Sequence, residues 1–185
     1  MAVGDVVQKE LISQSRLGAS LASQYAAPAN NTSQITTIYL ANTDLQNDKT
    51  VFLARSANAK NVLMPKITVP KGQCVVISFM NKILQATQAL YAKATGQTTG
   101  TAQAGTSSTI TLASGASSTD SYYVGQVIEL TGGQGSGQSA TISAYVGATK
   151  TATVDVAWGT VPNNTTTYEI GGVYMTADGI EEVVS

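Results

Sequence analysis

The stretch 97–172 consists mainly of Thr, Ser, Gly and Ala, and no basic residue occurs between Lys93 and Lys150. Short bursts of β-branched residues recur through it, separated by clusters rich in Gly and Ser. Such bursts favour strands, and the clusters between them mark turns. We therefore expect an almost uncharged all-β module with strands near 108–112, 127–130, 140–146, 151–156 and 166–170.

The segments that flank this module read as parts of one other domain. ALYAKATG precedes it, GVYMTADGIEEV follows it, and both alternate as strands do. The expected fold class is all-β, an antiparallel β-sandwich or barrel domain interrupted by a second small all-β domain. The expected division is an N-terminal arm at 1–16, a discontinuous β-sandwich anchoring domain at 17–97 plus 172–185, and an inserted Gly/Ser/Thr-rich β domain at 98–171.

The first domain shows regular short strands with a turn signal about every ten residues. Turns are marked by Pro28 with Asn30, by Asn47 with Asp48, and by Pro70 with Gly72. This spacing points to an antiparallel sandwich or barrel. Strands are expected at 20–26, 33–41, 50–54, 62–67 and 74–80.

The N-terminal segment 5–16 contains helix formers, but its apolar residues fall only partly on one helical face, and Gly18 interrupts the pattern. A terminal arm, ordered by a neighbouring molecule, is the expected structure. The segment lacks the basic start and unbroken apolar core of a signal peptide, and no stretch is long enough to span a membrane.

Charged residues make up only 11% of the chain, and the formal net charge is −1. A surface with so little charge repels its neighbours weakly, which suits a subunit packed against others. The charge is uneven: it is +5 over 1–97, −3 over 98–172 and −3 over 173–185. The cations of the first domain are scattered and have no aromatic stacking platform among them, so nucleic-acid binding is not expected.

The inventory of reactive side chains argues against catalysis. The chain has no histidine, which removes the usual general base and the commonest metal ligand. Its single cysteine, Cys74, lies in an alternating segment and is expected to be an ordinary strand residue. Carboxylates remain, but Asp120 and Asp178 both have the context of turn residues. We expect no catalytic, cofactor-binding or metal-binding residues, and no enzyme activity.

The glycine cluster GGQGSGQ at 132–138 superficially resembles a phosphate-binding loop. A phosphate loop would open a helix, or would carry a Lys followed by Ser or Thr. Here a period-two strand follows instead. The cluster is expected to be a flexible hairpin connection.

Several segments resemble a known class of proteins. The order TTIYLAN, TVFLAR, VPKGQCVVIS, ALYAKATG and TADGIEEV resembles small β-sandwich proteins of tailed-bacteriophage virions. The inserted region is similar to a β module added to assorted phage structural proteins. That similarity rests on Gly137, Gln138, Ile142, Tyr145, Gly147, Thr149, Ala152 and Val154.

This resemblance implies a virion component, most simply a capsid decoration or cement protein. Such a protein would be a homo-oligomer, a trimer being one arrangement. Its basic sandwich would dock on the major capsid protein or another virion protein, while the inserted domain projects outward. The expected location is the virion, assembled in the host cytoplasm, with no nucleic-acid or membrane partner and no cofactor.

The alternative is a carbohydrate- or receptor-binding module associated with a tail or fibre. The residues proposed for glycan contact are Tyr122, Tyr123 and Trp158, with Asn163 and Asn164 donating hydrogen bonds. A packing role competes with this interpretation, because a lone Trp among small residues is most simply a core residue. Tyr145, Tyr168 and Tyr174 are further candidates for stacking, although Tyr145 and Tyr168 fall within expected strands.

Overall fold

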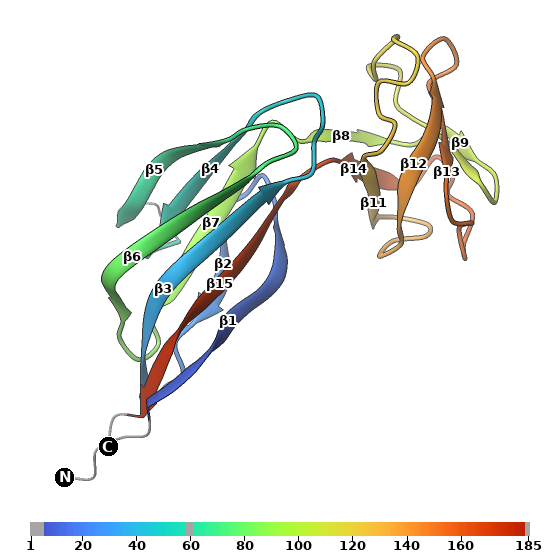
Figure 1. Ribbon diagram of the computed structural model, residues 1–185. Coiled ribbons are helices and arrows are strands. Elements are labelled where there is room, and N and C mark those ends of the chain that lie inside the picture. The colour runs from blue at the N-terminus through green and yellow to red at the C-terminus, as the bar shows by residue number, and fades with distance from the viewer. Residues whose placement is uncertain (1–5, 58–60, 184–185) are drawn as a thin grey trace. The chain divides into compact units, whose positions relative to one another are not determined.

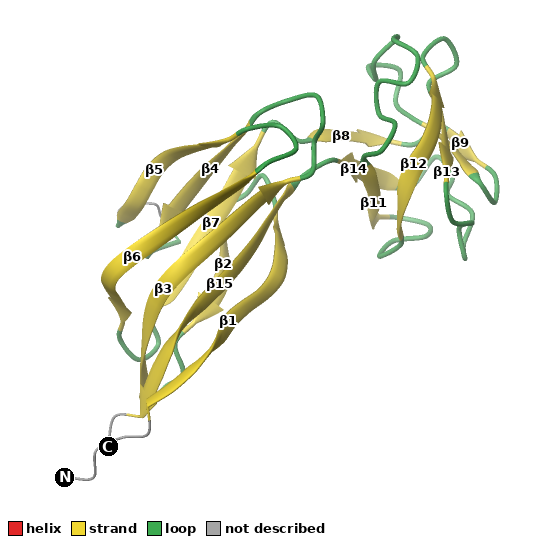
Figure 2. Cartoon of the chain, in the orientation of Figure 1, coloured by secondary structure: helices red, strands yellow, loops and turns green. Residues whose placement is uncertain are grey.

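The computed structural model describes residues 6–57 and 61–183, and these ranges contain fifteen strands and no helix (Figures 1 and 2). The strand pairings within them are all antiparallel. The predicted all-β class is therefore confirmed. No helix capable of crossing a membrane occurs in the described ranges.

The chain forms two compact units. The first comprises Met1–Asn42, Asp48–Gly96 and Val173–Ser185, and the second comprises Thr43–Asn47 and Gln97–Gly172. The loop Thr43–Asn47 had been expected within the first domain. It belongs to the second unit, where the Thr43 amide donates to the Gly172 carbonyl at 2.9 Å.

The first unit contains two four-stranded sheets that share one hydrophobic core (Figure 1). One sheet has the order β1 (Val6–Leu17), β15 (Val173–Val183), β3 (Asn31–Asn42), β6 (Cys74–Leu84). The other has the order β2 (Ala22–Ala26), β7 (Ala89–Thr95), β4 (Lys49–Ala54), β5 (Val62–Val69).

The core of this unit follows from strand alternation. Ile38 and Leu40 of β3 and Val51 and Leu53 of β4 are all fully buried, while the residues between them are less buried. Burying one such aliphatic side chain stabilises the fold by about 1.5–3 kcal/mol. Each sheet therefore has one face committed to the core and one outer face.

The N-terminal segment is a strand of the first unit rather than a separate arm. β1 pairs with β15 from Val6 opposite Glu182 to Leu17 opposite Val173, and the pairing has two register shifts. Ile12 and Leu17 are buried in the core. The bulges explain the misleading pattern, because each extra residue breaks the period of two that marks a strand. Residues 1–5 of the expected arm lie outside the described residues.

The second unit contains one seven-stranded sheet. The edge strands β8 and β9 are successive parts of the segment 98–105, which pairs with β14 in its first half and with β10 in its second. Between them, the Ala102 amide donates to Thr166 O and the Gln103 amide to Thr111 O, each at 2.8 Å. The order is β8 (Thr98–Thr101), β14 (Thr167–Ile170), β11 (Val127–Gly132), β12 (Ser139–Val146), β13 (Thr151–Val154), β10 (Thr109–Thr111), β9 (Ala104–Gly105).

The interior of the second unit is a separate core in which small and aliphatic side chains surround aromatic ones. Ile110, Ile128 and Ile142 are fully buried there. The glycine cluster lies in the connection between β11 and β12, as the sequence predicts.

Candidate functional site

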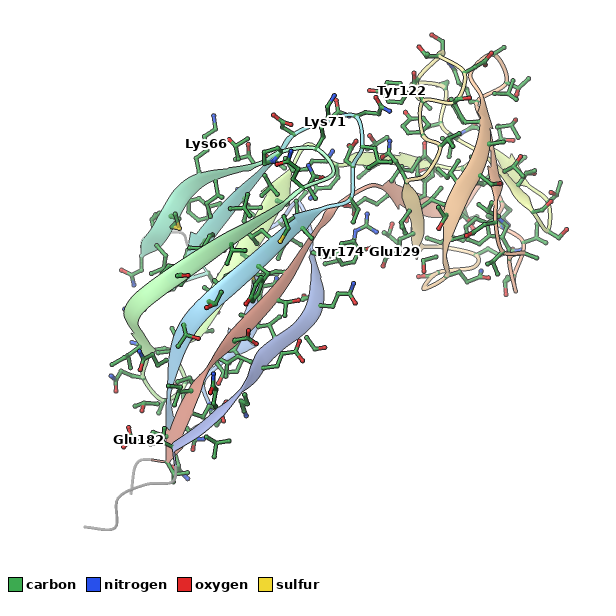
Figure 3. All side chains as sticks on the ribbon, in the orientation of Figure 1. Lys66, Lys71, Tyr122, Glu129, Tyr174 and Glu182 are labelled. Carbon is green, nitrogen blue, oxygen red and sulfur yellow. The ribbon has the colours of Figure 1, made fainter. Side chains whose placement is uncertain are left out.

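The aromatic residues proposed for glycan contact do not form an exposed platform. Tyr123 is 3% exposed and Trp158 is 6% exposed, so both lie in the core of the second unit. Tyr122 is partly buried and packs edge-on against Tyr123, with ring centroids 4.9 Å apart (Tyr122 is labelled in Figure 3). A sugar ring needs an open aromatic face for stacking, and Tyr123 and Trp158 offer none.

The tyrosine hydroxyls of this cluster form hydrogen bonds that stabilise the fold. Tyr123 accepts a hydrogen bond from the Ser117 amide at 3.0 Å, and Tyr145 donates to the Ser117 carbonyl at 2.5 Å. Burial raises the pKa of Tyr145 to about 12. These phenols therefore stay protonated and hold the 113–121 loop against the sheet.

Of the two carboxylates expected at turns, Asp120 lies at a turn, whereas Asp178 lies within β15 opposite Thr37, where a register shift separates it from Gly179. Asp120 and Asp155 have structural partners. Asp120 accepts a hydrogen bond from the Gly147 amide, and Asp155 accepts one from the Thr141 amide, both at 2.8 Å. Within residues 6–57 and 61–183, no group of three or more His, Cys, Asp or Glu side chains is placed to hold a metal ion. Cys74 is exposed at the start of β6.

A polar network closes one end of the first unit. The Glu181 carboxylate accepts hydrogen bonds from Tyr25 and, at 2.6 Å, from Lys9, and the Tyr25 hydroxyl also contacts Ser33 Oγ at 2.7 Å. Burial, followed by the bond to Glu181, raises the pKa of Tyr25 to about 12. Burial would also raise the pKa of Glu181, but the bonds from Lys9 and Tyr25 outweigh it and lower that pKa. The network joins strands of both sheets.

The outer face of the β2–β7–β4–β5 sheet carries positive charge. The sequences of these four strands contain no Asp or Glu. Lys93 of β7 and Phe52 of β4 are register partners, and the Lys93 ammonium lies 5.7 Å from the Phe52 ring centroid. Lys66 of β5 is exposed and extends away from the sheet (Figure 3). We call Lys66, Phe52 and Lys93, together with Tyr91, the basic face.

A hollow of about 320 Å³ lies where β4 ends and β5 begins. It is lined by Arg55, Asn61, Val62, Leu63 and Gln88, and the Arg55 guanidinium donates to the Gln88 side-chain carbonyl. The hollow therefore carries one guanidinium group, which is bonded to Gln88.

A groove of about 330 Å³ on the second unit brings together four side-chain amides. They come from three segments: the strip before β9, the β11–β12 loop, and the connection between β13 and β14. We call it the amide groove. It is lined by Gln103, Ala104, Gly105, Gln134, Val161, Pro162, Asn163 and Asn164.

Hydrogen bonds fix the walls of the amide groove. Asn163 Nδ2 donates to Gln134 Oε1, and Gln134 Nε2 donates to the Val161 carbonyl, both at 2.8 Å. The two walls approach closely at Gly105, where an added Cβ would lie 2.7 Å from Pro162 Cγ. Asn163 and Asn164 were expected to donate hydrogen bonds to a ligand, whereas Gln103 and Gln134 were not, because only folding brings them beside the asparagines.

Comparison with known proteins finds no family model, no curated protein and no solved structure that matches the chain.

Proposed function

We propose that the chain is a non-enzymatic structural subunit of a tailed-phage virion, a decoration or cement protein that docks on the major capsid lattice as a homo-oligomer. The resemblance of TTIYLAN, TVFLAR and TADGIEEV to virion β-sandwich proteins supports the class of protein. The observation that carries the docking role is the basic face, a sheet surface with the exposed Lys66 and the half-buried Lys93 in strands that contain no acidic residue.

The basic face is suited to an acidic protein surface. Phe52 offers an apolar contact, and Lys93 and Lys66 lie on the strands to either side of it. Aromatic and charged side chains often occur together where proteins bind one another. One such contact is weak, but an oligomer that repeats it on a lattice gains affinity from the linked sites. A modest face can therefore hold the subunit on the capsid.

The charges of the two units support the proposal that the second projects outward. The first unit has nine Lys and Arg against six Asp and Glu, a net charge of +3; the second has one against five, a net charge of −4. An acidic lattice attracts the first unit and repels the second.

The docking role is tested by charge reversal on the basic face. Lys66→Glu and Lys93→Glu are each expected to weaken co-sedimentation with capsids that lack the protein by about tenfold or more, because like charges then meet at the contact. Lys150→Glu, in the second unit, is the matched control and should bind as the unchanged protein does. Equal binding by all three variants would rule out docking through this face.

The second candidate function is a carbohydrate- or receptor-binding module on a tail or fibre. The amide groove favours it, since four uncharged amides converge there on one surface. The buried Tyr123 and Trp158 do not contribute to this case.

A further inference from the structure

The amide groove combines two kinds of surface. Gln103 and Asn164 expose amide groups that can donate and accept, although Gln103 Nε2 already donates to the Thr101 carbonyl at 3.0 Å. Gln134 and Asn163 bond to each other, and the exposed side chains of Val161 and Ala104 add apolar surface. None of the eight lining residues is charged. A ligand that fits this groove must therefore be neutral, rich in hydroxyls or amides, and apolar on part of its surface.

A neutral oligosaccharide meets these requirements. The carbonyl oxygen and amino group of one Asn or Gln side chain can accept from one hydroxyl and donate to its neighbour on a sugar ring. The C–H face of the ring can lie against the exposed side chains of Val161 and Ala104. A charged ligand would lose hydration without gaining an opposite charge, and that loss is unfavourable.

The groove is also organised in advance. Gln134 and Asn163 hold each other in place, and the Thr165 amide donates to Asn163 Oδ1 at 2.8 Å. Asn164 is exposed, and its side chain has no hydrogen-bond partner among the described residues, so its amide is available to a ligand. Ordering these side chains before binding reduces the entropy lost on binding.

We infer that the amide groove binds a neutral oligosaccharide through adjacent hydroxyl groups, with Asn164 and Gln103 in direct contact and Gln134 and Asn163 holding the geometry. This inference rests on the second candidate function and names its ligand class and site. An extended peptide is the main competitor, but peptides usually add a strand to a long sheet edge, and β9 spans only Ala104–Gly105.

The test is an NMR titration of the full ¹⁵N-labelled chain with maltotetraose, laminaritetraose and chitotetraose. At least one of these probes is expected to shift the side-chain amide signals of Asn164 and Gln103. Asn164→Ala should weaken that binding about fivefold or more, the usual effect of losing one hydrogen bond. Asn30→Ala, at an exposed turn of the first unit, is the matched control and should bind as the unchanged protein does.

Three results would overturn the inference. The first is no shift with any of the three probes, and the second is shifts confined to the Tyr122 region. The third is shifts in the groove caused by a neutral Thr/Ala peptide while the saccharides cause none. The capsid-binding assay uses other residues, so failure here leaves the docking proposal standing, and failure there leaves this one standing.

Discussion

At the scale of a single residue, Trp158 has two opposing effects on the stability of the second unit: burial of its ring and burial of its N–H group. The side chain is 6% exposed and belongs to the core, but its indole N–H has no acceptor among the described residues. A buried donor without a partner costs about 1–3 kcal/mol. The ring therefore stabilises the core by its volume while its nitrogen opposes that gain.

Replacing this residue separates the two effects. Trp158→Phe removes the unpaired donor and part of the volume, so we expect its free energy of unfolding to stay within about 1 kcal/mol of the unchanged protein. Trp158→Ala leaves a cavity and should lose about 3–5 kcal/mol. Denaturant unfolding followed by circular dichroism measures both. An equal loss in the two variants would show that the N–H carries no penalty.

Glu181 makes the stability of the first unit depend on pH. Its pKa is lowered in the folded protein, so folding is favoured by the ionised carboxylate. That contribution is complete above the ordinary carboxyl pKa of 4.5 and disappears as the pH falls through the lower folded value. Glu181→Gln should therefore reduce stability at pH 7 and flatten its decline in acid.

The measurement is the midpoint of thermal unfolding from pH 7 down to pH 2, compared with Glu182→Gln. Glu182 is the exposed neighbour and its replacement should leave the profile unchanged. If the Glu181→Gln profile runs parallel to that of the unchanged protein, the ion pair with Lys9 does not supply the pH dependence.

At the scale of elements, the β11–β12 loop depends on one glycine more than on its neighbours. Gly133 has φ +70°, and an added Cβ would lie 1.9 Å from the Thr165 carbonyl oxygen. Gly137 has φ +87°, but nothing lies within 4 Å of its added Cβ. The first position combines backbone strain with a clash against backbone, and the second has strain alone.

Alanine at these two positions should therefore act differently. Gly137→Ala should cost about 1–2 kcal/mol, the ordinary penalty of a left-handed residue with a side chain. Gly133→Ala should cost more, because the 163–166 turn that lines the amide groove must move. Thermal unfolding measures the loss of stability in each variant, and the Asn163 side-chain NMR signals report movement of the turn. Equal losses of stability in the two variants, with unshifted Asn163 signals, would contradict this prediction.

The alternation of apolar and polar residues made many strands of both units predictable from the sequence. β15 keeps a regular pattern of buried and less buried residues from Val173 to Glu181, and β3 keeps one on either side of a register shift at Thr36, so their positions follow from it. β1 was misread because two bulges break its period. β8 and β9 were missed because TTGT and AG are short and carry no apolar alternation. The amide groove was only half predictable, since its amides come from three separate segments.

At the scale of the whole molecule, the two units have opposite net charges and each has its own core. Attraction through the basic face should depend on salt, because exposed charges are screened within about 10 Å at 0.1 M ionic strength. Raising the salt from 50 to 500 mM should weaken capsid binding by the unchanged protein. A variant with both Lys66→Glu and Lys93→Glu should lose this dependence on salt. If salt weakens capsid binding by this variant as much as by the unchanged protein, the basic face is not the source of the attraction.

The most direct test of the central claim is the copy number of this chain in purified virions, measured by quantitative mass spectrometry against the major capsid protein. A decoration protein that covers the lattice predicts a ratio approaching one copy per capsid subunit. A handful of copies per particle would contradict that role and place the protein at the neck or tail.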